Sequence, residues 1–165
     1  MTRFSRPTAV LVAAIALLAA AAGLRSSASA QAPPGRTLTL TELERGSTFT
    51  HVRNTKGASP RSNLQGDLIV FTNPLADASG KRIGKISVSC TTTTGARNFV
   101  KSTITCAGVL ALRDGTLTLQ ANTRPGSPTT AGAVTGGTGA YANARGVFVS
   151  SQARGGSRDT ITLAG

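Results

Sequence analysis

The chain has 165 residues, with 18 lysine and arginine residues against 6 aspartate and glutamate residues, and its formal net charge is +12. A balance this basic suits nucleic acid, anionic lipid or an anionic cell-surface polymer as a partner, and it is equally typical of a solvated basic surface. Because the basic residues are scattered and aromatic residues make up only 4% of the chain, we exclude a nucleic-acid-binding protein.

The chain begins with a predicted secretory signal peptide at residues 1–30, which should be helical. Arg3 and Arg6 precede an apolar run over residues 8–24, and the small residues at 28–30 (ASA) supply a cleavage site. The alternative is a retained membrane anchor, since the apolar run is at the short limit for a membrane span. The cleavage site favours removal, so we expect a secreted, extracellular or cell-envelope protein without a membrane span.

A single β-domain is predicted at residues 37–165, after a flexible proline-rich leader at residues 31–36. No window keeps the apolar period of a helix, and short β-favouring runs alternate with clusters of Gly, Pro, Asn and Asp. The expected strands are 37–44, 47–53, 67–72, 85–93, 99–112, 116–121, 131–135, 146–152 and 159–163. Eight or nine short strands suit either a sandwich or a barrel, and their spacing alone leaves both open.

The two cysteines, Cys90 and Cys106, favour a disulfide in a chain sent to an oxidising compartment. If the two long strands pair antiparallel so that Cys90 faces Cys106, then Ile86 also faces Leu110. This register puts the apolar groups and both sulfurs on one face of the sheet. The alternative is a free Cys90 thiol that acts as a pocket group or nucleophile.

Four glycines over residues 133–146 (AVTGGTGAYANARG) predict a tight corner between two strands. Glycine is required there for positive φ or for the close approach of another chain segment. The glycines of this structural turn are Gly136, Gly137, Gly139 and Gly146.

Several motifs lack the sequence context of a recognisable functional site. Residues 137–142 match a loose dinucleotide fingerprint, with Asp159 at a suitable distance, but a strand rather than a helix follows them. His51 is the only histidine and is expected to be structural rather than catalytic. Glu42 and Glu44 share one strand face, either as a carboxylate pair or as solvated edge charges. We expect no metal and no cofactor, because two cysteines and one histidine are too few for a structural zinc site.

Two blocks of sequence resemble a known superfamily. GDLIVFTNP at 66–74 and KRIGKISVSC at 81–90 resemble plant allene oxide cyclases. The glycine-rich corner at 133–146, with GTLTLQ at 115–120 before it, is similar to both the cyclases and the dirigent proteins. The resemblance implies an all-β fold, a small closed antiparallel eight-stranded barrel with a central apolar pocket, and a homotrimer in some members. It also implies three pocket residues: Phe71 and Cys90 in the wall, and Asn73 as an amide that holds a water.

The sequence departs from the cyclases on its first strand. When the strand is aligned on residues 45–47 (RGS), Thr39 and Thr41 fall where the cyclases carry a glutamate and an asparagine. Thr48 falls where they carry a proline that contacts the water. A neutral hydroxyl cannot steer a cationic intermediate as a carboxylate does, so we expect a relative of the cyclases without allene oxide cyclase activity itself.

The expected function is a secreted barrel that binds a small hydrophobic ligand without converting it. A second reading is an isomerase, cyclase or dirigent-type auxiliary that acts on a reactive intermediate derived from a lipid or a phenol. In that reading the pocket holds one conformer and excludes water, with Asn73 orienting a water or carbonyl and Phe71 restricting the conformer. A third reading is a surface protein held by charge on an acidic polymer.

Overall fold

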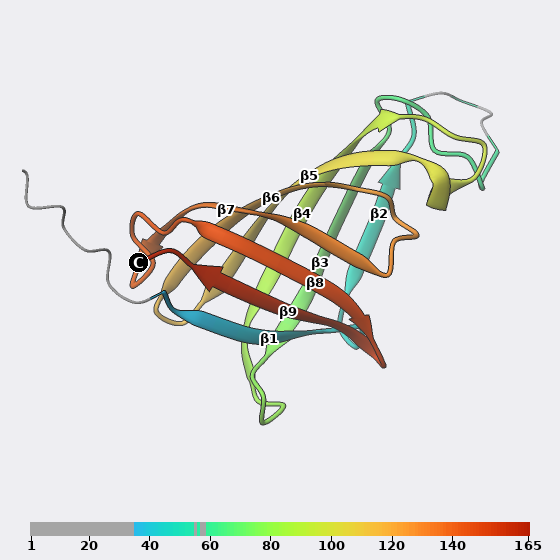
Figure 1. Cartoon of the computed structure of the whole chain (residues 1–165). Helices are drawn as coiled ribbons and strands as arrows, with labels where there is room; N and C mark the ends of the chain where they lie inside the picture. Colours follow the sequence, from blue (N-terminus) through green and yellow to red (C-terminus); the bar gives the residue numbers. More distant parts are fainter. Residues whose placement is uncertain (1–34, 55, 57–58) are drawn as a thin grey trace, which may run out of the picture. The chain divides into compact units, whose positions relative to one another are not determined.

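The computed structural model describes residues 35–54, 56 and 59–165 (Figure 1). The predicted signal peptide at 1–30 and most of the leader at 31–36 lie outside these residues. Among the described residues, no helix is both long and apolar enough to cross a membrane.

The described chain is almost entirely antiparallel sheet, as expected. Its only helical element is a single 3-10 turn, η1 (Phe99–Lys101), before the fifth strand. The strands are β1 (Thr37–Leu43), β2 (Thr48–Val52), β3 (Leu68–Ala76), β4 (Arg82–Thr94), β5 (Thr103–Leu112), β6 (Gly115–Thr123), β7 (Thr129–Gly139), β8 (Gly146–Ala153) and β9 (Gly156–Leu163).

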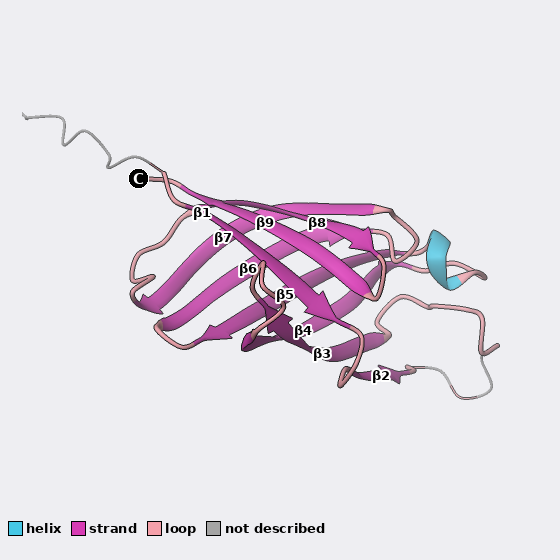
Figure 2. Cartoon of the chain, turned by 90° about the horizontal axis from the view of Figure 1, so that it is seen from below, coloured by secondary structure: helices cyan, strands magenta, loops and turns pink. Residues whose placement is uncertain are grey.

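Eight of these strands close a barrel, which confirms the predicted fold. The order is β1-β9-β8-β7-β6-β5-β4-β3, and β1 returns to pair with β3 through Thr41↔Ala76 and Glu42↔Leu75. The ninth strand, β2, pairs with the earlier part of β3, from Thr48↔Thr72 to Val52↔Leu68. Both β1 and β2 therefore pair with β3, over successive stretches of it, and β2 lies beside β3 at the margin of the sheet (Figure 2).

The barrel interior is filled with apolar side chains in one part only. Strand alternation buries every second residue, for example Ile86, Val88 and Cys90 of β4, while Ser87 and Ser89 face outward. The most deeply buried large side chains are Leu75, Leu110, Leu117 and Ile161. None of these four side chains lines the cavity described below, so the most deeply buried part of the core lies away from the hollow.

The pairing of β4 with β5 follows the predicted register. Cys90 lies opposite Cys106 and Ile86 opposite Leu110. The two cysteines form a disulfide across these neighbouring strands. The alternative of a free Cys90 thiol is therefore wrong.

The glycine-rich corner differs from the prediction in its boundaries. Strand β7 continues through Gly136, Gly137 and Gly139, and the chain reverses only over residues 140–145 before β8 begins at Gly146. Gly136 and Gly137 lie within the strand, whereas Gly139 has φ +61° where the chain begins to reverse. A Cβ on Gly137 would clash with the backbone of Tyr141, whose side chain is buried in the core.

Gly146 has φ +155° and lies against the carbonyl oxygen of Thr162, so any side chain there would be strained and blocked. The predicted strand at 99–112 also needs correction. Its first residues form η1, capped by the Asn98 side chain, and β5 begins only at Thr103. The run of β-favouring residues concealed this break.

We predict that the disulfide contributes substantially to stability. Because the two cysteines are 16 residues apart, the double variant Cys90→Ala/Cys106→Ala should lose roughly 3 kcal/mol in the free energy of unfolding. Urea unfolding measures this loss, and reduction of the unsubstituted protein should reproduce most of it without any change in packing. A loss below about 1 kcal/mol in both samples would contradict the prediction.

Candidate functional site

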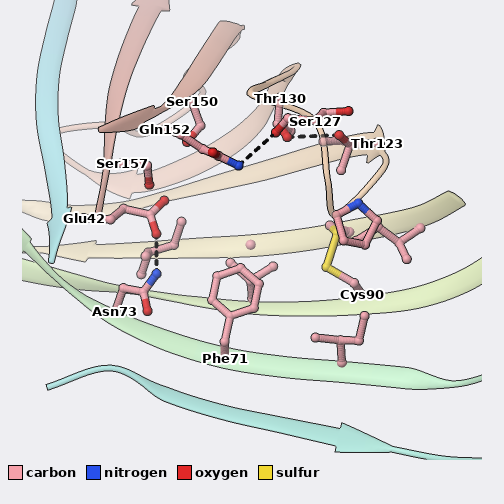
Figure 3. A pocket seen from close by; sticks show the side chains of 18 of the residues that line it. Glu42, Phe71, Asn73, Cys90, Thr123, Ser127, Thr130, Ser150, Gln152 and Ser157 are labelled. Atoms are coloured by element: carbon pink, nitrogen blue, oxygen red, sulfur yellow. Dashed lines mark hydrogen bonds between the residues drawn. A yellow bond between two sulfur atoms is a disulfide. The ribbon is translucent and has the colours of Figure 1, made fainter. Parts of the chain in front are cut away.

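A cavity of about 840 Å³ lies inside the barrel and opens at the end where β6 meets β7. Its size is within the range of ligand-binding pockets for small organic molecules. One wall is apolar and comes mainly from β3 to β6, with the side chains of Ile69, Phe71, Ile86, Val88, Ile104 and Leu119. The opposite wall is polar and comes from β7, β8, β9 and β1, with Thr130, Ser150, Gln152, Ser157 and Glu42 (Figure 3).

All three residues that the family resemblance assigned to a pocket lie in the lining of this cavity. Phe71 and Asn73 project from β3 and Cys90 from β4. The Cys90 sulfur is engaged in the disulfide, so it contributes an apolar wall without a reactive thiol. The Asn73 side chain is directed at a carboxyl group that the alignment did not expect.

That carboxyl group belongs to Glu42, which is only 8% exposed. Glu42 pairs with Leu75 across the closure of the barrel, and Asn73 is therefore its diagonal neighbour on the same face. Asn73 Nδ2 donates a hydrogen bond to Glu42 Oε2 (Figure 3). The closure between β1 and β3 thus brings together two polar side chains at the edge of an apolar cavity.

A second buried carboxyl group accompanies Glu42. Asp159 of β9 is 3% exposed and lies opposite Leu40 and Ser150 in the neighbouring strands. Its Oδ1 has no hydrogen-bond partner among the described residues. Burial, and secondarily the charge of Asp159, raise the pKa of Glu42 to about 7, although the Asn73 hydrogen bond opposes the shift.

Burial also raises the pKa of Asp159, while its hydrogen bonds with Ser150 and Glu42 act in the opposite direction. In this poorly solvated site Glu42 keeps its proton to a higher pH than an ordinary carboxylic acid does. Such a group can donate and accept a proton near neutral pH. Raised carboxyl pKa values inside a cavity are a physical marker of functional sites.

The first strand directs a carboxyl group into the cavity, whereas neither of the two aligned threonines, Thr39 and Thr41, lines it. Thr39 is exposed on the outer face and Thr41 is only partly buried, because strand alternation turns the positions of Leu38, Leu40 and Glu42 inward. The pattern of the segment itself, TLTLTEL, carried the signal, since Leu38 and Leu40 share a face with Glu42.

The other candidate residues of the sequence have different positions. Glu44 lies beyond the end of β1 at the exposed rim of the cavity, so the buried partner of Glu42 is Asp159 rather than Glu44. Thr48 also lines the rim. No cluster of three or more metal-ligating side chains occurs within the described ranges.

His51 belongs to a separate structural cluster under the loop before β3. Its Nε2 lies 3.3 Å from Oδ2 of the buried Asp67, and its ring centroid lies 5.7 Å from that of Phe99. Asp67 also accepts hydrogen bonds from the backbone N–H groups of Asn54 and Leu64. Burial opposes ionisation of Asp67, but these backbone bonds and His51 outweigh it and lower the pKa of Asp67. His51 does not line the cavity, so it orders the loop.

The raised pKa of Glu42 predicts a specific pH dependence of stability. Between the ordinary value of 4.5 and about 7 the folded protein binds more protons than the unfolded chain, so stability should fall as pH rises through this window. A shift of this size corresponds to a loss on the order of 3 kcal/mol. Glu42→Gln should remove most of the decline, measured by urea unfolding at pH 4.5 and pH 7.5.

The matched control for this prediction is Glu44→Gln on the exposed rim, which should keep the decline. If Glu42→Gln lost stability between the two pH values as steeply as the unsubstituted protein, the assignment of the shift to Glu42 would be wrong.

Comparison with known proteins gives likenesses in structure only. No family model matches the sequence, and no curated protein sequence matches it. A pyocyanin demethylase structure superposes with a TM-score of 0.62 and 23% identity, covering 78% of this chain and 99% of that chain. A pterocarpan synthase dirigent protein gives a TM-score of 0.57 and 18% identity, covering 79% and 83%.

The Diels-Alderase AbmU from Streptomyces koyangensis gives a TM-score of 0.53 and 12% identity, covering 79% of this chain and 62% of that chain. Identities this low show a shared fold, and they agree with the closed eight-stranded barrel described above. The chain therefore shares the barrel fold of these dirigent, demethylase and Diels-Alderase structures.

Proposed function

We propose that this protein binds a small, largely apolar molecule inside its barrel. The observation that carries the proposal is the cavity of about 840 Å³, which has an apolar wall on one side and a few convergent polar groups on the other. The disulfide is typical of proteins of an oxidising compartment, which supports action outside the cytoplasm. The structural neighbours are named for reactions of small organic molecules, which supports a ligand of this kind.

The first test is binding of a neutral fluorescent probe, N-phenyl-1-naphthylamine. The purified protein should increase the fluorescence of this probe saturably. Ala121→Trp should weaken binding roughly tenfold, because Ala121 lines the cavity and an indole there takes up its volume. The matched control, Ala107→Trp, places the same ring on the exposed face of β5 and should leave binding unchanged.

Two results would contradict the proposal. One is the absence of saturable binding to the unsubstituted protein, and the other is equal binding by both tryptophan variants. Circular dichroism and thermal unfolding of the variants establish that each one is folded before binding is compared.

The Glu42–Asp159 pair supports a second candidate function, catalysis of an isomerisation or cyclisation. In such a reaction Glu42 donates its proton to one atom of a lipid- or phenol-derived intermediate, and its carboxylate then recovers a proton from another atom of the same molecule. No co-reactant is needed, because the substrate and the product have the same composition. Asn73 holds the Glu42 carboxyl group in place, and the Phe71 ring restricts the conformer.

This candidate predicts the pH profile of any epoxide or enone that the protein converts. Because the acid form of Glu42 is active, kcat/KM should fall as pH rises through about 7. Glu42→Gln should lower kcat/KM by roughly a hundredfold, whereas Glu44→Gln should not change it. Equal turnover by the Glu42→Gln variant would eliminate Glu42 as the acid and leave the binding proposal in place.

A further inference from the structure

The phenylalanines of the described chain all gather at the cavity. Aromatic residues make up only 4% of the sequence, yet four phenylalanines from four different elements line this one hollow. Phe49 of β2 and Phe71 of β3 are direct cross-strand partners, Phe99 belongs to η1, and Phe148 projects from β8. Apolar volume alone does not require this, because the filled part of the barrel is packed mainly with leucine and isoleucine.

The four rings form a series from solvent to interior. Phe49 is 62% exposed at the rim, Phe71 and Phe99 are half-buried, and Phe148 is 8% exposed. A phenylalanine this exposed beside a cavity offers apolar surface for a ligand to cover. A bound aromatic molecule gains more binding free energy from phenylalanine neighbours than an aliphatic chain of equal area does. The reason is that offset and edge-to-face contacts between rings are favourable.

One side of the mouth of the cavity is formed by segments that carry only basic charged residues. Three segments form this side: η1, the turn at 124–128 and the turn at 153–156. These segments contain Lys101, Arg124 and Arg154 and no acidic residue, although Glu44 lies elsewhere on the rim. Arg124 itself lines the cavity.

None of these three cations forms a salt bridge with a carboxylate of the described chain, so they are available to an anion. The turn at 124–128 is held in position by its neighbours. Gln152 Nε2 donates a hydrogen bond to the carbonyl oxygen of Ser127 at 3.3 Å (Figure 3), and Gly126 packs directly on Val100 of η1.

We infer that the ligand of the proposed binding function is an aromatic organic anion, with its rings among the phenylalanines and its acidic group at Arg124. The buried Glu42 carboxyl group fixes the orientation, because it lies on a different side of the cavity from the turn that carries Arg124 (Figure 3). An anionic group placed beside Glu42 would meet a carboxyl group in a poorly solvated site, whereas at Arg124 it meets a cation and water. The anion therefore remains at the mouth, and the uncharged part of the ligand points toward Glu42.

The experiment compares two probes that share their aromatic rings. 8-Anilino-1-naphthalenesulfonate carries an anionic group, and N-phenyl-1-naphthylamine lacks it. The unsubstituted protein should bind the sulfonate more tightly, and Arg124→Gln should weaken only the sulfonate, by roughly three- to fivefold for a solvent-exposed charge pair. The control is Arg113→Gln in the β5–β6 turn, at the opposite end of β6, which should change neither affinity.

Competition tests the aromatic requirement separately. 1-Naphthoate should displace the bound sulfonate at lower concentration than decanoate does, and Phe49→Leu should reduce this difference while the protein remains folded. Equal displacement by the two acids would overturn the aromatic assignment.

The two probes distinguish failure of the anion site at Arg124 from failure of the binding function on which it rests. If the neutral probe binds in the cavity but the sulfonate binds no better, or if Arg113→Gln weakens the sulfonate as much as Arg124→Gln does, the assignment of an anion at Arg124 is wrong and the binding function stands. If neither probe binds saturably, the binding function fails as well.

Discussion

The closure of the barrel through β1 and β3 is the constraint on which the candidate site depends. Only two residue pairs make this contact, and one of them contains Glu42. Because side chains alternate along a strand, the register that directs Leu38 and Leu40 inward also directs Glu42 inward. The apolar surroundings then disfavour its charged form, and Asp159 on the neighbouring strand adds to the effect. One register thus determines both the closed architecture and the chemistry of the cavity.

The two parts of the barrel interior have different roles. Large aliphatic side chains and the buried ring of Tyr141 pack one part of it into a stable core. The other part is hollow, and neighbouring strands around it are joined by a disulfide between β4 and β5 and by a hydrogen bond between Thr123 and Thr130 of β6 and β7. The Glu42 carboxyl group lies at the polar wall of this cavity, and the buried Asp159 lies behind it on the neighbouring strand. A rigid hollow with few fixed polar groups suits recognition of a small molecule more than a change of shape.

Much of this could be predicted from the sequence, because the relevant signals are local. The pairing of Cys90 with Cys106 and of Ile86 with Leu110 followed from alternation along two neighbouring strands. The glycine-rich segment was recognised, but its turn lies later than expected, since glycines inside β7 serve close packing against Tyr141. The carboxyl pair was missed because Glu42 and Asp159 are far apart in sequence and meet only through the pairing of the first and last strands.

A direct measurement of the Glu42 carboxyl titration tests the central claim best. NMR detection of the side-chain carboxyl carbon, assigned with the Glu42→Gln variant, gives its pKa in the folded protein without reference to any ligand. The account predicts a pKa of about 7 for Glu42, with a second inflection from coupling to Asp159. A single titration near the ordinary value of 4.5 would show that Glu42 is solvated, and would contradict a closed barrel that holds this residue inside.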